Sequence, residues 1–206
     1  MGYVEVPTMN QNAAQEIETS ERILDVAERL VQTRGFNGFS YAHIAAELEL
    51  TKPALHYHFP NKAEMVRSLV ARYTERFDRS LADIDALRLD SRGMLANYTQ
   101  IYVDVVRSGR MCLCGMLAAE YQTLPSAVQQ AVMEFFDRNE TWLAHVLDDG
   151  RLDGSLRFEG QTSEIARFVL SELEGAMLLA RLHNDSEQFE GAVGRLLAGF
   201  TAVLKT

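Results

Sequence analysis

Apolar residues recur every three to four positions along nearly the whole chain, and this periodicity constrains the fold more than any other feature. The stretch 20–34 shows the pattern clearly, with Ile23, Ala27 and Leu30 on one face. Such spacing is typical of amphipathic helices. Alternation of β-branched residues at every second position, which would indicate strands, does not persist in the sequence. The sequence therefore predicts an all-α fold of about nine helices.

Capping residues and helix breakers predict where these helices begin and end. Ser, Thr, Asn and Asp favour helix starts, whereas Gly and Pro favour helix ends. Thr51 and Asn61 are therefore expected to begin helices, and Pro60 to end one. Glycines at positions 150, 154 and 160 indicate a loop. On these signals we expect helices over residues 20–34, 40–48, 51–59, 61–83, 91–108, 114–123, 126–146, 162–183 and 186–204.

The composition excludes several classes of protein. The chain has 206 residues with only 4 Pro, and 47% of them are hydrophobic, which excludes collagen-like and largely disordered chains. No apolar run approaches the roughly 18 residues of a membrane span, and no signal peptide opens the chain. The two cysteines, Cys112 and Cys114, are too few for a disulfide scaffold. We expect a cytoplasmic protein with no membrane partner.

The charges are distributed unevenly. The net charge is −9, which by itself disfavours nucleic acid as a partner. However, the segment 51–76 has five basic and two acidic side chains, whereas the segment 81–206 has 11 basic and 18 acidic ones. A short basic segment near the N-terminus therefore precedes an acidic remainder.

The basic segment lies within a pair of short helices, predicted over 40–48 and 51–59. Helices this short are unstable alone because nucleation is costly, so they must pack on the amphipathic helix 20–34. Three helices with a tight turn between the last two form a helix-turn-helix, whose second helix offers its first residues to the DNA major groove. The sequence therefore predicts a DNA-binding head.

Side chains of the second short helix suit contacts with DNA. Lys52 can donate to guanine, and Pro53 and Ala54 can contact a thymine methyl group. Phosphate oxygens suit donors such as Tyr57 and Lys62. The full set of predicted DNA contacts is Ser40, Tyr41, Ala42, Lys52, Pro53, Ala54, His56, Tyr57, His58 and Lys62. Plain structural packing of a short helix pair is the alternative. His56 and His58 face different sides of a helix, so no metal site is predicted.

This segment resembles the N-terminal domain of the TetR (tetracycline-repressor) family of bacterial regulators. The resemblance covers about residues 23–69 and is carried by Ala27, Gly35, Phe36, Ser40, Ile44, Ala45, Leu48, Thr51, Leu55, Tyr57, His58, Phe59, Asn61 and Lys62. It implies a homodimeric regulator, usually a repressor, that a small-molecule effector releases from a double-stranded DNA operator. It also implies that Ser40, Tyr41, Tyr57, His58 and Lys62 contact the DNA backbone, while Ala42, Lys52, Pro53 and Ala54 face bases.

Two positions depart from the family pattern. Glu49 stands at the turn where the family usually has Gly, which tolerates a positive φ. His56 stands where the family usually has Tyr. The resulting domain prediction is a mobile N-terminal arm over residues 1–18, a DNA-binding domain over 19–62, and a ligand-binding and dimerisation domain over 63–206.

Large side chains in the C-terminal region predict an apolar ligand cavity with a few polar anchors. The predicted ligand contacts are Tyr98, Tyr102, Cys112, Met116, Glu120, Phe136, Phe168 and Glu172. Core packing, or a solvated helix face for the two glutamates, is the alternative for each. The segment 111–117 resembles a cysteine-containing stretch in a branch of the family that responds to electrophiles or oxidants. A sensing thiol needs a lowered pKa, and a buried inert thiol is the alternative.

The two last helices are apolar on more than one face, which predicts burial against two partners. Paired with their symmetry mates they would form a four-helix dimer interface, as the family resemblance also implies. The predicted interface residues are Phe168, Ala176, Ala180, Val193, Leu196, Leu197, Phe200 and Leu204.

Two other function classes are alternatives to the ligand-responsive regulator. An enzyme is not predicted, because the sequence lacks metal-binding His/Glu pairs, nucleophile motifs and phosphate-binding Gly loops; no cofactor is expected either. A helical ligand-binding protein or thiol-based sensor with weak or lost DNA binding stays open, because the net charge is −9 and His56 departs from the family pattern.

Overall fold

The computed structural model of the chain describes residues 11–200. Within that range it contains nine α-helices, one short 3-10 helix and no strand, so the predicted all-α class is confirmed. The helices are α1 Gln11–Arg34, α2 Tyr41–Leu48, α3 Lys52–His58, α4 Lys62–Ala86, α5 Ser91–Arg107, α6 Leu113–Ala119, η1 Tyr121–Thr123, α7 Ser126–Asp153, α8 Thr162–His183 and α9 Ser186–Gly199.

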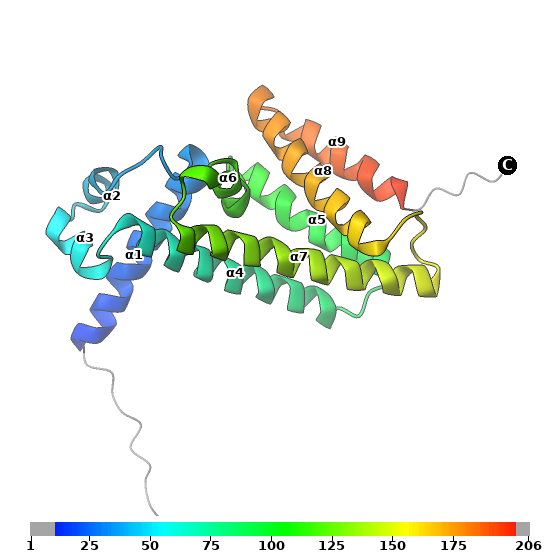
Figure 1. Ribbon diagram of the computed structural model, residues 1–206, viewed down its shortest axis with the longest axis horizontal. Coiled ribbons are helices and arrows are strands. Elements are labelled where there is room, and N and C mark those ends of the chain that lie inside the picture. Colours follow the sequence, from blue (N-terminus) through cyan, green and yellow to red (C-terminus); the bar gives the residue numbers. More distant parts are fainter. Residues whose placement is uncertain (1–10, 201–206) are drawn as a thin grey trace, which may run out of the picture.

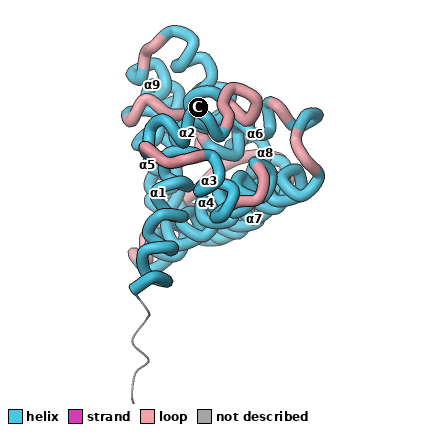
Figure 2. The backbone as a smooth tube through the Cα atoms, turned by 90° about the vertical axis from the view of Figure 1, so that its left-hand side faces the viewer, coloured by secondary structure: helices cyan, strands magenta, loops and turns pink. Residues whose placement is uncertain are grey.

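The molecule is elongated, with a three-helix head at one end and a helical body along the rest (Figure 1). α1, α2 and α3 form the head, and α4 runs from beneath the head into the body, where it packs along α7. α8 packs on both α7 and α9, and α5 lies against α7 and α9. α6 contacts α1 and α7 and so lies where head and body meet. Figure 2 shows the molecule from the head end.

Apolar burial holds the short helices of the head in place. Ile23 and Ala27 of α1 are fully buried, as is Ile44 of α2, and Leu55 of α3 is 1% exposed. α2 has 8 residues and α3 has 7, so neither contains enough internal hydrogen bonds to persist alone. Their conformation therefore depends on packing against α1 and against each other.

The predicted caps of the head helices are confirmed. The Thr51 hydroxyl accepts a hydrogen bond from the backbone N–H of Ala54, at 3.3 Å, and Pro53 lies in the first turn of α3. Asn61 Oδ1 accepts from the N–H of Glu64 at 2.9 Å and begins α4. These bonds satisfy N–H groups that have no partner within the helix.

Two helix ends within the described residues differ from the sequence prediction by more than five residues. α1 begins at Gln11, so the part of the predicted mobile arm that lies within the described residues is helical; residues 1–10 lie outside them. The sequence of this extension is mostly polar and residues 15–18 are exposed, so it carries no apolar stripe that would predict a helix. α7 continues to Asp153, beyond the predicted end at residue 146. Gly150 lies within α7, where a Cβ would come within 2.5 Å of Leu156, so close packing rather than a turn requires glycine there.

No helix within residues 11–200 is both long enough and apolar enough to cross a membrane.

Glu49 adopts the left-handed conformation that glycine favours. Its φ is 56° and its ψ is 34°, and it ends α2 at the turn toward α3. For an L-residue this region costs about 1–2 kcal/mol because Cβ approaches the following carbonyl oxygen. The turn geometry of the head is therefore retained here without the usual glycine, at a cost in stability.

Replacing Glu49 by glycine is expected to stabilise the protein. Glu49→Gly removes the Cβ clash, and we expect the free energy of unfolding, measured by urea denaturation, to rise by about 0.5–1 kcal/mol. The matched control is Ala46→Gly, an exposed position within α2, which should lower stability by about 1 kcal/mol. Equal destabilisation by both substitutions would show that Glu49 is unstrained.

Candidate DNA interface and C-terminal core

The predicted DNA contacts all lie on α2, on α3 or on residues that flank them. Tyr57 is 71% exposed, and Lys52 is exposed at the start of α3 without a hydrogen bond or ion pair to any described residue. The exposed members of the set are Ser40, Ala42, Lys52, Pro53, His56 and Tyr57, and the half-buried ones are Tyr41, Ala54, His58 and Lys62.

Tyr41 and His56 also hold the two short helices together. The Tyr41 hydroxyl donates to the carbonyl of Phe59 at 2.9 Å, and burial raises the pKa of Tyr41 to about 12. Its ring centroid lies 4.9 Å from that of His56, whose Nδ1 is 3.0 Å from the carbonyl oxygen of Pro60. Because a carbonyl oxygen can only accept, Nδ1 of His56 carries a proton. Both residues therefore position α3 whatever they contact in DNA.

His43 caps α2, a role that the sequence analysis missed. Its Nδ1 accepts a hydrogen bond from the backbone N–H of Ser40 at 3.0 Å. Glu or Gln usually occupies this third helical position in a capping box, so a histidine gave no recognised signal.

Lys62 joins the start of α4 to the loop between α1 and α2. Its ammonium donates to the carbonyl oxygens of Phe36 and Phe39. It also lies 4.5 Å and 4.1 Å from the centroids of those two rings, a cation–π arrangement. Burial lowers the pKa of Lys62, while the nearby Glu120 carboxylate acts in the opposite direction. An ammonium has three donors, and these two carbonyls use two of them.

The N-terminal extension of α1 reaches the recognition helix. Glu16 Oε1 accepts a hydrogen bond from the Tyr57 hydroxyl at 2.9 Å, which raises the pKa of Tyr57. The sequence analysis predicted a mobile arm here, and no motif connected Glu16 with α3. The contact orders an otherwise exposed ring.

The body has a buried polar chain inside an aromatic cluster. The hydroxyl oxygens of Tyr98 and Tyr102 are 3.1 Å apart, and the Tyr98 hydroxyl donates to Asn139 Oδ1 at 3.1 Å. The Tyr98 ring stacks on Trp142 with centroids 5.4 Å apart, and its edge meets Phe77. Burial raises the pKa of both tyrosines, so both hydroxyls stay protonated. These two predicted ligand contacts are thus buried core residues.

Both cysteines are buried thiols. Cys112 Sγ accepts a hydrogen bond from the N–H of Gly115 at 3.4 Å and so caps α6. Burial, followed by the nearby Glu174 carboxyl, raises the pKa of Cys112 and of Cys114. A reactive thiol requires the opposite direction, because the thiolate is the nucleophile.

Glu174 is the polar group that the sequence analysis missed in this core. Its Oε1 is buried without a hydrogen-bond partner, and a Cβ on Gly115 would lie 2.1 Å from its Oε2. Gly115 therefore makes room for the carboxyl group. Burial raises the pKa of Glu174 to about 7, while a hydrogen bond with Cys112 lowers it. Glu172, the predicted anchor two residues earlier, is exposed because two residues turn a helix by about 200°.

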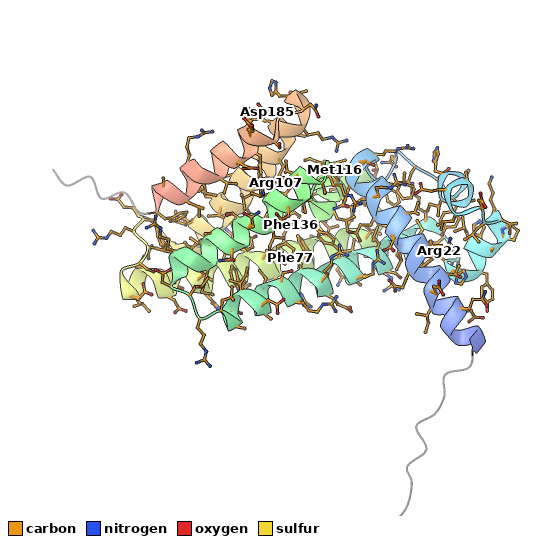
Figure 3. All side chains as sticks on the ribbon, turned by 180° about the vertical axis from the view of Figure 1, so that it is seen from behind. Arg22, Phe77, Arg107, Met116, Phe136 and Asp185 are labelled. Atoms are coloured by element: carbon orange, nitrogen blue, oxygen red, sulfur yellow. The ribbon has the colours of Figure 1, made fainter. Side chains whose placement is uncertain are left out.

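The other predicted ligand contacts do not gather at one place. Glu120 accepts from the backbone N–H of Asn37 at 3.1 Å, at the junction of head and body. Phe136 is half-buried against Phe135, whereas Phe168 is 54% exposed on α8. Met116 lies near the end of α1 (Figure 3).

Two surface grooves between α4 and α7 lie apart from this set. A groove of about 390 Å³ is lined by residues that include Thr74, Gln130 and Arg138. A second, of about 500 Å³, contains Trp142 and His145. Neither groove is lined by any predicted ligand contact.

Most of the predicted interface residues pack inside one chain. Ala180, Val193, Leu196 and Phe200 are between 2% and 8% exposed because α8 and α9 pack on each other and on α5. Ala176 and Leu197 are half-buried, and Leu204 lies outside the described residues.

The outer face of α8 carries exposed apolar surface, and Phe168 is the predicted interface residue that lies on it. Phe168 is 54% exposed, Leu179 50% and Leu182 74%. Gly175 lies between them, and no atom comes within 4 Å of where its Cβ would be. The spacing of these four residues places them on one stripe of the helix. We call Phe168, Gly175, Leu179 and Leu182 the α8 stripe.

Comparisons with known proteins match both parts of this architecture. Residues 23–69 match the family profile described as bacterial regulatory proteins of the tetR family. Residues 92–196 match the profile of the tetracyclin repressor-like C-terminal domain, which covers half of the chain. The chain belongs to the TetR family. It is therefore a member of a family of bacterial transcriptional regulators, as the sequence analysis predicted.

Individual TetR-family proteins are similar over most of their length. A TetR-family regulator from Agrobacterium tumefaciens is 29% identical, with a TM-score of 0.88, and the match covers 91% of this chain and 100% of that one. A regulator from Legionella pneumophila is 30% identical, with a TM-score of 0.80, over 88% and 97% of the two chains. The transcriptional repressor NemR of Escherichia coli K12 is 25% identical over 90% of this chain and 95% of its own.

Glu174 is expected to make stability depend on pH. Its pKa is about 7 in the folded chain and 4.5 ordinarily, so between these values the folded state holds a proton that the unfolded state releases. The free energy of unfolding should therefore fall as pH rises from about 5 to 8. Glu174→Gln, which carries no charge, should gain about 1–3 kcal/mol relative to the natural chain over that interval in urea denaturation.

The control for this measurement is Glu172→Gln, an exposed position on the same helix. Its stability relative to the natural chain should be the same at pH 5 and pH 8. If the stability of Glu174→Gln relative to the natural chain were also the same at pH 5 and pH 8, the Glu174 carboxyl would be solvated.

Proposed function

We propose that this TetR-family protein is a dimeric transcriptional repressor that binds a pseudo-palindromic operator and is released by a small molecule bound in the C-terminal domain. The observation that carries the proposal is the exposed start of α3, where Lys52 has no partner within the described residues. A solvated lysine at this position of a helix-turn-helix is available to a base edge in the major groove. Such a regulator acts in the cytoplasm.

The net charge of −9 does not by itself exclude DNA binding. Phosphate attraction depends on local charge near the contact, because solution screens interactions beyond about 10 Å. Lys52 and Pro53 enter the groove in this proposal, while Ser40, Tyr57 and Lys62 donate to phosphates. Glu16 already accepts the Tyr57 hydrogen bond, so a phosphate must replace that carboxylate.

Selection of duplexes from a randomised pool tests the proposal directly. The protein should enrich a sequence with two inverted half-sites, and Lys52→Ala should relax preference at one position of each half-site, with a loss of about 1–3 kcal/mol for the preferred base. Arg92→Ala is the control because Arg92 is an exposed basic residue in the body. Failure to enrich any duplex at low salt contradicts the proposal, and an unchanged motif removes Lys52 from base recognition.

Effector release requires that the ligand bind the DNA-incompetent state more tightly, typically with a coupling of about 1–3 kcal/mol. The polar chain of Tyr98 and Tyr102, with Cys112 and the unpaired oxygen of Glu174, is the part of the body that we propose for ligand contact. A thiol-based sensor receives no support, because burial raises the pKa of both cysteines.

A second copy of the chain is the partner proposed for the α8 stripe. The TetR family supports this choice, because its regulators typically act as dimers on DNA. Gly175 allows a close approach of two helices, and the large apolar side chains on either side of it would leave water on association. A two-fold axis through this face would bring two heads to inverted half-sites.

Leu179→Glu should convert the dimer to a monomer, because it buries a charge in the proposed interface. Light scattering after gel filtration should change from about twice the chain mass of 23.2 kDa to that mass itself. Leu152→Glu is the control, since Leu152 is 85% exposed near the end of α7 and away from the stripe. A dimer that survives Leu179→Glu would place the interface elsewhere.

A further inference from the structure

An arginine of the body holds the last turn of the first head helix. Arg181 lies in the last turn of α8, and its Nη2 donates to the carbonyl oxygen of Thr33. Its Nη1 is 3.4 Å from the carbonyl oxygen of Gln32 and 3.3 Å from Met116 Sδ. The guanidinium of Arg181 therefore links its own helix, α8, to α1 and α6. These three helices come from distant parts of the sequence.

These carbonyls are ones that the helix itself leaves unpaired. The final four carbonyl groups of a helix have no partner within it, and α1 ends at Arg34, directly after Gln32 and Thr33. A guanidinium also interacts favourably with the negative end of the helix dipole. Arg181 thus makes charge-assisted hydrogen bonds where α1 most needs donors.

Neighbouring groups strengthen the same junction. The backbone N–H of Met111 donates to the carbonyl of Gln32 at 3.4 Å, and Arg110 reaches the Gln32 side chain at 3.5 Å. In the loop between α1 and α2, the backbone N–H of Asn37 donates to the Glu120 carboxylate, and its side-chain amide donates to the Thr123 hydroxyl. Arg181 has no carboxylate partner among the described residues, so its charge is directed at the carbonyls of α1.

The position of Arg181 on α8 links this junction to the proposed dimer face. Leu182 and Leu179 of the α8 stripe are one and two residues away on the same last turns. A single rigid helix therefore carries both the surface offered to a second copy and the side chain that grips α1. In a dimer formed through the α8 stripe, α8 therefore sets the orientation of each head relative to the two-fold axis.

We infer that Arg181 is a positioning residue that locks the DNA-binding head to α8 and thereby sets the half-site spacing that the dimer accepts. The effect on half-site spacing rests on the proposed function, because it requires a dimer that binds DNA. The structural part of the inference, the locking of head to body, applies to each chain separately and is tested without DNA.

The first measurement is the distance between head and body in solution. Spin labels at Ala46→Cys in α2 and Arg92→Cys in α5, diluted with unlabelled protein, report this distance by double electron–electron resonance. The native thiols are buried and should stay unlabelled. The distance distribution should be narrow in the natural background and broader with Arg181→Gln. An equally narrow distribution with Arg181→Gln overturns the inference, whether or not the protein binds any DNA.

The second measurement uses duplexes whose two half-sites are moved apart or together by one and two base pairs. Arg181→Gln should reduce the preference for the best spacing over the others by about tenfold, while the half-site sequence and the dimer mass stay unchanged. Arg167→Gln is the matched control, because Arg167 lies on the same helix but pairs with Glu140. It should keep the natural spacing profile.

Arg181→Lys separates positioning from folding. It keeps the charge but lacks the fork that reaches two adjacent carbonyls, so a folded protein with an intermediate spacing preference is expected. If Arg181→Gln proves unstable, this variant is used for both measurements. If the folded variant shows the same preference among half-site spacings as the natural chain, the inference is overturned. Failure of the natural chain to bind any duplex counts against the proposed function instead, and the distance measurement then decides on Arg181.

Discussion

The DNA-binding surface depends on one constraint, which is that α2 and α3 are too short to be stable without tertiary packing. Their buried residues, Ile44 and Leu55, need the apolar face of α1 and the packing of α2 on α3. The loop carbonyls gripped by Lys62 and the bond from Tyr41 to Phe59 complete this support. Any movement of α1 or α4 therefore moves the surface that meets DNA, which is the physical basis for control from a distance.

The body holds polar groups inside an apolar bundle. Glu174 and the tyrosine pair are costly to bury, and the unpaired oxygen of Glu174 gives this core a preference for any state that offers it a donor. α6 contacts both this region and α1, and Arg181 reaches α1 from the helix that carries Glu174. Core and head are therefore connected through short, specific contacts rather than through the long helix α4 alone.

The sequence determined the helices and the head, because both follow from local signals. Apolar periodicity, the caps at Thr51 and Asn61, and the breaker Pro60 gave nearly every helix boundary within the described residues. The motif from Tyr57 to Lys62 located the recognition helix. The start of α1 was missed because its first turns are polar and bury no stripe, and the end of α7 because Gly150 normally signals a loop.

Only the tertiary structure decided which polar residues are buried and which apolar ones are exposed. Glu172 and Glu174 look alike in sequence, yet the packing of α8 against α6 buries the second and exposes the first. The same rotation of α8 places Ala180 in the core and leaves Leu182 in solvent. The grip of Arg181 on α1 was equally invisible, because 148 residues separate the partners. Hydrophobic periodicity shows that a helix has an apolar face. Contacts with elements far away in the sequence determine which of its residues are buried.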